Sequence, residues 1–398
     1  MRKKRIFYTV VCLFAILFCL PVCSAPITNA GSALPLDTNL FSVMPKSTVP
    51  AAQAPQTSAA SYALLDPVSG KLIAEKDADT RRPMASTTKI MTALIVLERC
   101  DLEATVTVDQ RAVGVEGSSI YLFATEQIKV HTLLYALMLA SANDAAAALA
   151  IHTAGSIESF AVLMNEKAAA LGLKDTHFCN PHGLHDNAHY TTARELALLT
   201  AAAMENKTFS EIVATARYSA PQIGTNASRL FLNHNKLLRT FDGAIGVKTG
   251  FTKTSGRCLV SAAGRDGLTL IAVTLNDPND WRDHTALYEW GFSQYVAFAP
   301  TPSPLTLPVV GGISGEVLLT PRGTLRLTLP ATHGEITCTV EAPRFLFGGF
   351  DKDEVRGRLV YRMGDTVLGE IPLATADAVP TVKAKQNLWD RIKNLFRK

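Results

Sequence analysis

The sequence has few charged residues and only a small excess of one sign. Asp, Glu, Lys and Arg make up 19% of its 398 residues, and the formal net charge is +4. Domains that bind nucleic acid are usually strongly basic or carry a concentrated basic patch, so we expect no nucleic-acid partner. A hydrophobic content of 47% argues against a disordered chain. The length predicts more than one domain.

Cysteine is also sparse. Of the seven cysteines, Cys12, Cys19 and Cys23 lie in or beside an N-terminal apolar run. The other four are far apart in the sequence: Cys100, Cys179, Cys258 and Cys338. An exported protein could form disulfide bonds, but spacing alone does not reveal their pairing. We therefore expect isolated thiols.

The densest group of potential metal ligands is the histidine-rich stretch HFCNPHGLHDNAH at 177–189. Zinc is commonly bound by His and Cys side chains, so a zinc site is one hypothesis. The pair Asn180-Pro181 and the nearby Gly183 indicate a turn instead. We predict that the protein binds no metal and needs no cofactor.

The N-terminus carries a long apolar run, Ile6–Leu20, preceded by basic residues at 2–5 and followed by the small residues Ser24 and Ala25. This arrangement is typical of a secretory signal peptide. The run is short for a membrane-spanning helix, although an uncleaved anchor remains the alternative. We predict a signal peptide at 1–25 and an exported protein.

The remaining chain divides by composition. Residues 26–58, rich in Ala, Pro, Ser and Thr, predict a flexible linker. Residues 59–297 have strand patterns at both ends and helical patterns between them, which predicts an α/β sandwich whose ends share one sheet. Strand patterns occur at 62–77 and 258–275, and helical patterns at 86–98, 131–140, 144–154, 157–171 and 281–295.

After a Pro-rich linker at 299–304, short alternating segments predict a small all-β domain at 298–377. The last segment, 378–398, contains KAKQNLWDRIKNLFRK, whose apolar residues follow helical spacing and whose other face is basic. Such a helix lies in a membrane interface, so we predict a peripheral anchor on the outer face of the cytoplasmic membrane. Docking of this helix on the β domain is the alternative.

Three short motifs occur in a fixed order: S-x-x-K, then S-x-N, then K-T-G. Each is weak alone, because a serine such as Ser86 could simply cap a helix. Together, with S-D-N as the usual middle element, they are typical of penicillin-binding proteins and class A β-lactamases. The residues concerned are Ser86, Lys89, Ser141, Asn143, Lys248, Thr249 and Gly250.

The segments ASTTKIMTAL, LLYALMLASANDAA, NPHGL and GVKTGFT resemble the D-alanyl-D-alanine carboxypeptidases of peptidase family S11, which are low-molecular-mass penicillin-binding proteins. The resemblance implies a penicillin-recognising α/β domain related to β-lactamases and transpeptidases, then a β-rich domain and a membrane-anchoring tail. The implied substrate is the peptidoglycan pentapeptide stem ending in D-Ala-D-Ala. β-Lactam antibiotics are expected to acylate the same serine.

The resemblance implies catalytic roles for Ser86, Lys89 and Ser141 and substrate-binding roles for Asn143, Lys248, Thr249 and Gly250. A serine hydroxyl needs a base to remove its proton. Lys89 can be that base only when neutral, and burial or a nearby cation such as Lys248 would lower its pKa. The Ser141 hydroxyl could pass a proton to the leaving amine, and Lys248 and Thr249 suit a terminal carboxylate.

Two activities of the same fold remain as alternatives, namely a serine β-lactamase and a D,D-endopeptidase or transpeptidase. A class A β-lactamase uses a glutamate after the S-x-N motif to activate water, but Glu195 lies in an ordinary helical pattern. Several positions depart from the family pattern: Ala142 stands where the family usually has Gly, and Ala124-Thr125-Glu126 replaces a more usual Gly-Glu pair. Phe251 follows K-T-G where some have His, and His234 stands where some have Arg.

Overall fold

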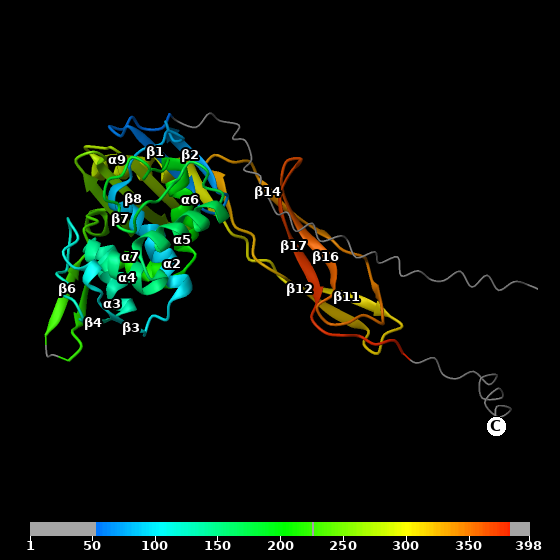
Figure 1. Cartoon of the computed structure of the whole chain (residues 1–398). Helices are drawn as coiled ribbons and strands as arrows, with labels where there is room; N and C mark the ends of the chain where they lie inside the picture. The colour runs from blue at the N-terminus through cyan, green and yellow to red at the C-terminus, as the bar shows by residue number, and fades with distance from the viewer. Residues whose placement is uncertain (1–52, 225–226, 383–398) are drawn as a thin grey trace, which may run out of the picture.

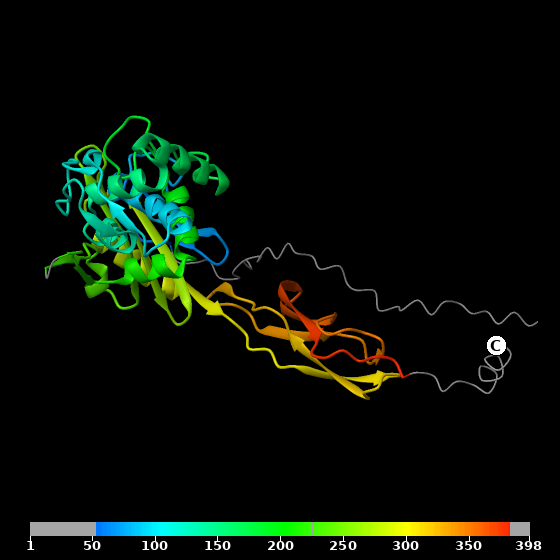
Figure 2. The ribbon, with the colours of Figure 1, turned by 60° about the horizontal axis from the view of Figure 1, so that its bottom comes forward.

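The computed structural model describes residues 53–224 and 227–382. The predicted signal peptide, most of the predicted linker and the amphipathic segment from 383 onward lie outside these described residues. Figure 1 shows a large domain and an elongated β domain arranged end to end. Figure 2 shows the same separation after a rotation of 60°.

A five-stranded antiparallel sheet forms the centre of the large domain, with the strand order β2-β1-β9-β8-β7. Ser61 on β1 lies opposite Leu275 on β9, so the two ends of this domain lie side by side. This confirms the prediction of a shared sheet. The strands are β1 (Ser61–Asp66), β2 (Lys71–Lys76), β7 (Ala244–Thr252), β8 (Gly256–Arg265) and β9 (Leu268–Leu275).

Both faces of this sheet are covered. Ala63 and Leu65 enter one hydrophobic core, whereas Leu64 between them enters a second core with Leu287 and Tyr288. Successive strand residues point to opposite faces, so the α/β sandwich is confirmed. The first face carries α2 (Lys89–Arg99), α3 (Val130–Leu139), α4 (Asn143–Ala154), α5 (Ile157–Ala170), α6 (Ala193–Met204) and α7 (Lys207–Ala214), and the second carries α8 (Leu237–Thr240) and α9 (Asp280–Gln294).

Short elements complete the large domain. The helix predicted at 86–98 begins later, at Lys89, because Ala85–Thr88 form a separate 3₁₀ turn, η1. Two small antiparallel strand pairs and a second 3₁₀ turn lie among the helices: β3 (Thr105–Thr107) with β4 (Gln127–Lys129), β5 (Arg217–Pro221) with β6 (Ser228–Leu232), and η2 (Gln110–Ala112).

The β domain contains a six-stranded sheet in the order β14-β16-β17-β12-β11-β15 and a separate pair formed by β10 and β13. Leu319, Leu329 and Leu373 are fully buried in its own hydrophobic core. β10 follows α9 directly, so its pairing with β13 ties the two domains together. The strands are β10 (Tyr295–Phe298), β11 (Leu305–Val310), β12 (Glu316–Pro321), β13 (Leu327–Pro330), β14 (Ile336–Glu341), β15 (Leu346–Phe347), β16 (Val355–Met363) and β17 (Thr366–Thr375).

The ends of the described chain differ from the sequence-based expectation. Ser58, assigned to the flexible linker, donates hydrogen bonds to Asp277 and Asp283 at 2.5–2.6 Å and is therefore held on the large domain. Residues 378–382, assigned to the amphipathic helix, lie extended, with Thr381 bridging to Gly312 and Val379 to Phe350. These bridges satisfy backbone groups that a helix would have paired internally.

Among the described residues, no single helix is long and apolar enough to cross a membrane. The helices α4 and α5 meet that criterion only as a pair bent by 82°.

A buried histidine joins the sheet to α9. The ring nitrogens of His284 lie 2.7 Å from Ser261 Oγ and 3.0 Å from Thr274 Oγ1. The Ser261 hydroxyl also contacts the Tyr288 hydroxyl at 2.7 Å. Complete burial lowers the pKa of His284 to about 3. The ring therefore stays neutral in the folded protein at pH values where an unfolded histidine takes up a proton.

This burial predicts acid sensitivity. Between pH 6.5 and about 3 only the unfolded state protonates His284, so the free energy of unfolding should fall as the pH is lowered through this range. His284→Gln should be less stable at pH 7 but should lose less stability on acidification. Urea unfolding at pH 7 and 4.5 measures both, with the exposed His333→Gln as control. Equal losses in wild type and His284→Gln would contradict the prediction.

Candidate active site

Ser86 lies on the 3₁₀ turn η1, which leads directly into α2. The residue before it, Ala85, has a φ of 48° and is buried, whereas Ser86 is half-buried. The Ser86 side chain does not cap η1 or α2, because neither element has a side-chain cap hydrogen bond. The turn therefore presents the Ser86 hydroxyl to solvent rather than using it to begin a helix.

Lys89, the first residue of α2, is fully buried beneath Ser86. Its Nζ lies 2.9 Å from Ser86 Oγ, 2.6 Å from Asn143 Oδ1 and 2.8 Å from the His182 carbonyl oxygen. The last two atoms can only accept hydrogen bonds. A neutral amine can donate its two hydrogens to them and keep its lone pair for the Ser86 hydroxyl. The geometry therefore suits a lysine that removes a proton from serine.

The electrostatics favour the neutral form of this amine. Burial lowers the pKa of Lys89 well below its usual value, and the nearby charge of Lys248 lowers it further, against an opposing effect of Asp144. Burial also lowers the pKa of Lys248 to about 7. A base is most effective when its pKa lies near the working pH.

The S-x-N motif lies between α3 and α4. Ser141 has a φ of 58°, and this backbone conformation turns the chain sharply before α4 begins at Asn143. The Asn143 Nδ2 donates to the Glu116 carbonyl at 2.5 Å, which orients its Oδ1 toward Lys89. A side chain held at both ends can place Lys89 and contact a substrate without reorganising.

The K-T-G motif lies on β7, at the edge of the central sheet. Lys248 points inward and is 1% exposed, and its Nζ donates to the Thr249 carbonyl at 2.9 Å. A Cβ atom on Gly250 would lie 3.0 Å from the Ser86 nitrogen and 3.2 Å from the Met84 oxygen. A side chain here would crowd the turn that carries Ser86, because β7 passes so close to it.

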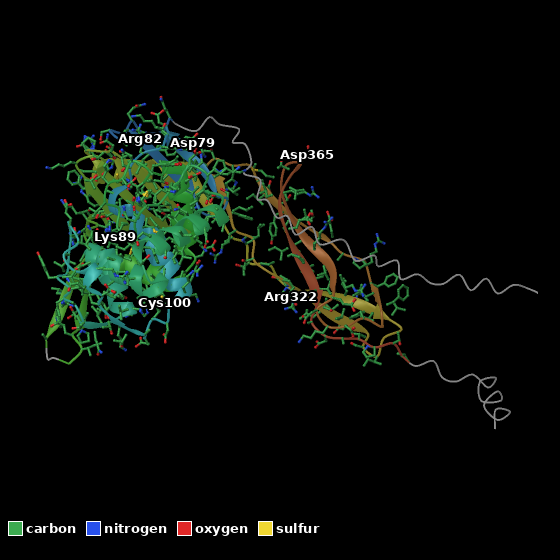
Figure 3. The ribbon with its side chains drawn as sticks, viewed as in Figure 1. Asp79, Arg82, Lys89, Cys100, Arg322 and Asp365 are labelled. Carbon is green, nitrogen blue, oxygen red and sulfur yellow. The ribbon has the colours of Figure 1, made fainter. Side chains whose placement is uncertain are left out.

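A cleft of about 350 Å³ opens above these residues. Figure 3 shows Lys89 inside the large domain and Arg322 and Asp365 on the β domain. The residues that line the cleft all belong to the large domain: Ser86, Ser118, Ser141, His234, Lys236, Thr249, Gly250, Phe251, Arg257, Asp280 and Trp281.

The structure thus brings all seven predicted site residues together. Ser86, Lys89 and Asn143 are joined by hydrogen bonds, and Ser141, Thr249 and Gly250 line the same cleft. Lys248 lies close enough to affect the pKa of Lys89. Their individual roles stay predictions.

The turn at 180–183 supports the site from the opposite side. The Pro181 carbonyl accepts a hydrogen bond from Thr92 Oγ1 at 2.6 Å, and the next carbonyl, of His182, contacts Lys89. Gly183 has a φ of 88°, and a Cβ atom on it would lie 1.9 Å from the Ala85 oxygen. The turn can approach η1 this closely only because residue 183 is glycine.

Three histidines of this stretch, His177, His182 and His189, have hydrogen-bonding partners within the described chain. His189 Nδ1 accepts from the Cys179 N–H at 3.0 Å, which leaves Nε2 to donate to Thr88 Oγ1 at 2.7 Å. Burial lowers the pKa of His189 to about 4 and that of His182 to about 3. Within residues 53–224 and 227–382, no group of three or more His, Cys, Asp and Glu side chains is placed to hold a metal ion.

The motifs alone did not reveal two contributors to the site. The His182 carbonyl is a backbone atom, and its only sequence signal is the N-P-H-G-L turn itself. Asp144 directly follows the S-x-N motif and is buried. Its carboxylate accepts from Ser119 Oγ and from the N–H groups of Ile120 and Leu122, and so holds the 116–122 loop against α4.

Comparison with known proteins gives consistent matches. The family model described as D-alanyl-D-alanine carboxypeptidase matches residues 48–279. A D-alanyl-D-alanine carboxypeptidase from Streptomyces sp. is 38% identical over 243 residues, which are 56% of this chain and 84% of that protein. The D-alanyl-D-alanine carboxypeptidase DacA of Escherichia coli is 31% identical over 376 residues, which are 86% of this chain and 89% of that protein.

A solved structure extends the similarity to the fold. Penicillin-binding protein 5 from Haemophilus influenzae superposes with a TM-score of 0.65 at 27% identity, covering 83% of this chain and 99% of that one. A match of this extent includes the β domain as well as the large domain.

The approach of Gly183 to η1 predicts a large stability cost for any side chain at this position. Gly183→Ala should lower the free energy of unfolding by roughly 3 kcal/mol or more, because strain at positive φ adds to a clash with the Ala85 carbonyl. Gly155→Ala is a matched control, since Gly155 has a φ of 82° but open space around its Cβ position. It should cost only about 1–2 kcal/mol. Urea unfolding that gave equal costs would contradict this prediction.

Proposed function

The chain belongs to the D-alanyl-D-alanine carboxypeptidase family of serine peptidases, and we propose that it removes the terminal D-Ala from peptidoglycan pentapeptide stems through an acyl-enzyme on Ser86. The observation that carries this proposal is the buried Lys89 amine, whose Nζ lies 2.9 Å from Ser86 Oγ. Its N–H groups can donate to two carbonyl oxygens, those of the Asn143 side chain and the His182 backbone. Penicillins acylate the same serine because their β-lactam carbonyl occupies the place of the scissile peptide.

In the first step, Ser86 Oγ attacks the carbonyl carbon between the two D-Ala residues while Lys89 takes the hydroxyl proton. The carbonyl oxygen becomes an oxyanion that backbone N–H groups can stabilise. Ser86 itself and the adjacent strand β7 supply these donors. The 3.0 Å approach of the Gly250 Cβ position to the Ser86 nitrogen supports this assignment, since it places both backbones at one point.

In the second step, the C–N bond breaks and the proton passes through the Ser141 hydroxyl to the leaving amine, which departs as free D-Ala. Asn143 holds the substrate backbone, and Lys248 and Thr249 lie on the side of the terminal carboxylate. Water then hydrolyses the ester on Ser86 with Lys89 again acting as the base.

The position of Glu195 favours this activity over a class A β-lactamase. Its carboxylate accepts hydrogen bonds from the Asp175 N–H and Thr176 Oγ1, and these contacts hold the loop before α6. Glu195 is not among the residues that line the cleft. It is therefore not positioned to activate water at an ester on Ser86.

We further propose that the protein is exported and held at the outer face of the cytoplasmic membrane. The signal pattern at 1–25 and the basic amphipathic pattern at 383–398 support this proposal. The described chain also ends at the end of the β domain that lies away from the large domain (Figures 1 and 2). An anchor attached there would leave the cleft free to reach the cell wall.

Two substitutions test the chemistry. Ser86→Ala should abolish both labelling by a fluorescent penicillin and D-Ala release from a pentapeptide. Lys89→Ala should retain Ser86 but acylate about 10²–10⁴ times more slowly, the usual contribution of a general base. Circular dichroism should show both variants folded. Labelling of Ser86→Ala at another serine, or parental acylation by Lys89→Ala, would show that the nucleophile or the base lies elsewhere.

Removal of residues 384–398 tests the anchor. The mature enzyme lacking them should fail to sediment with anionic vesicles, because it loses the basic and apolar residues of the predicted interfacial helix. Its D-Ala release in solution should match that of the full-length enzyme. Continued sedimentation of the truncated enzyme, or its unfolding, would refute the anchoring role.

A further inference from the structure

The substrate of the proposed reaction ends in a carboxylate that must lie in the cleft. In the terminal D-Ala, the carboxylate and the leaving nitrogen are attached to the same carbon. The carboxylate therefore lies close to the carbonyl that Ser86 attacks. A carboxylate removed from water needs a cation or several hydrogen bonds around it. The cleft therefore has to supply a positive charge on the leaving-group side.

Most basic side chains of the site already have hydrogen-bonding partners within the protein. Lys89 is buried among its three hydrogen-bonding partners, and Lys248 is buried with its Nζ bonded to the Thr249 carbonyl. Burial also lowers the pKa of Lys248 to about 7, so much of it is neutral at neutral pH. Arg257 binds the Asp280 carboxylate through two hydrogen bonds, of 2.9 and 3.1 Å, which cancel its charge.

His234, the histidine that lines the cleft, does not supply the positive charge either. Partial burial and the neighbouring Lys248 lower the pKa of His234 below its usual value, so its ring is neutral under the same conditions.

Lys236 is the cation that remains. It is exposed, it lines the cleft together with Ser86 and Thr249, and its ammonium makes no hydrogen bond or ion pair within the part of the chain that the structure describes. Its charge acts on Asp280, which also lines the cleft. Burial raises the pKa of Asp280, and Lys236 is among the cations that oppose this rise.

We infer that Lys236 supplies the positive charge that recognises the terminal carboxylate of the substrate, beside the hydroxyl of Thr249. The inference rests on the proposed carboxypeptidase function. It assigns to Lys248 the lesser role of lowering the pKa of Lys89 from below the cleft. Lys236 is thus a specificity-determining residue that selects chains with a free C-terminal carboxylate. The same charge selects β-lactams that carry a carboxylate.

The test compares two forms of one substrate. An N-acylated peptide ending in D-Ala-D-Ala is assayed as the free acid and as the C-terminal amide. Lys236→Ala should lower kcat/KM on the free acid on the order of tenfold, the usual weight of a hydrogen bond to a charged group. It should leave the amide unchanged, and Lys236→Arg should keep the preference for the acid.

Lys71→Ala is the matched control, because it removes an exposed lysine from β2, at the opposite edge of the same sheet from β7. It should change neither substrate. An equal loss on acid and amide by Lys236→Ala, or no loss on either, would overturn the inference, since neither result reflects recognition of the carboxylate.

Acylation by benzylpenicillin and by its methyl ester provides a second readout that does not depend on D-Ala release. Lys236→Ala should acylate more slowly with the acid only. If wild-type enzyme is acylated with this acid preference but releases no D-Ala, the proposed function fails while the role of Lys236 stands. If wild type releases D-Ala and Lys236→Ala keeps the full acid preference, the role of Lys236 fails alone.

Discussion

The burial of the Lys89 amine is the constraint on which the rest of the site depends. Its partners Ser86, Asn143 and His182 come from three segments that are far apart in the sequence. Leaving a buried polar group without partners costs about 1–3 kcal/mol, and more if the group is charged. Lys89 can therefore occupy its position only when η1, the start of α4 and the turn at 180–183 are all in place, so folding itself assembles the reactive amine.

Backbone packing around η1 then positions the serine. The turn carrying Ser86 lies between Gly183 on one side and Gly250 on the other, and a Cβ atom at either position would meet the backbone of residues 84–86 within 3.2 Å. Since β7 is an edge strand, its free side lines the cleft. One strand thus packs against the turn that carries Ser86 and also leaves an edge free at the cleft, where an extended chain can pair.

The degree of burial distinguishes three lysines of the site, Lys89, Lys248 and Lys236. Lys89 and Lys248 are withdrawn from water, which lowers both pKa values and favours the neutral form of the Lys89 amine. Lys236 stays exposed at the cleft. An exposed lysine side chain that lines the cleft can contact an anionic group of a substrate. The position in the fold, not the residue type, separates these functions.

Much of the fold and the motif residues were predictable from the sequence, because periodicity and motif order are properties of neighbouring residues. The strands at 62–77 and 258–275 and the helix at 144–154 all appear within about two residues of their predicted bounds. The start of α2 was wrong by three residues, since the local pattern could not distinguish η1 from the helix that follows it. Residues 378–382 were wrongly assigned to a helix because their partners, such as Gly312, lie far away in the sequence.

The sequence by itself determined the identity and order of the motif side chains, from Ser86 to Gly250, and the two ends of one sheet. Only the tertiary structure decided that a carbonyl of His182 completes the environment of Lys89, that Lys89 is fully buried, and that Lys236 lacks a partner among the described residues. Every residue has a carbonyl group, and every lysine has the same ammonium. Their roles are therefore set by burial and by distant neighbours, which exist only once the chain has folded.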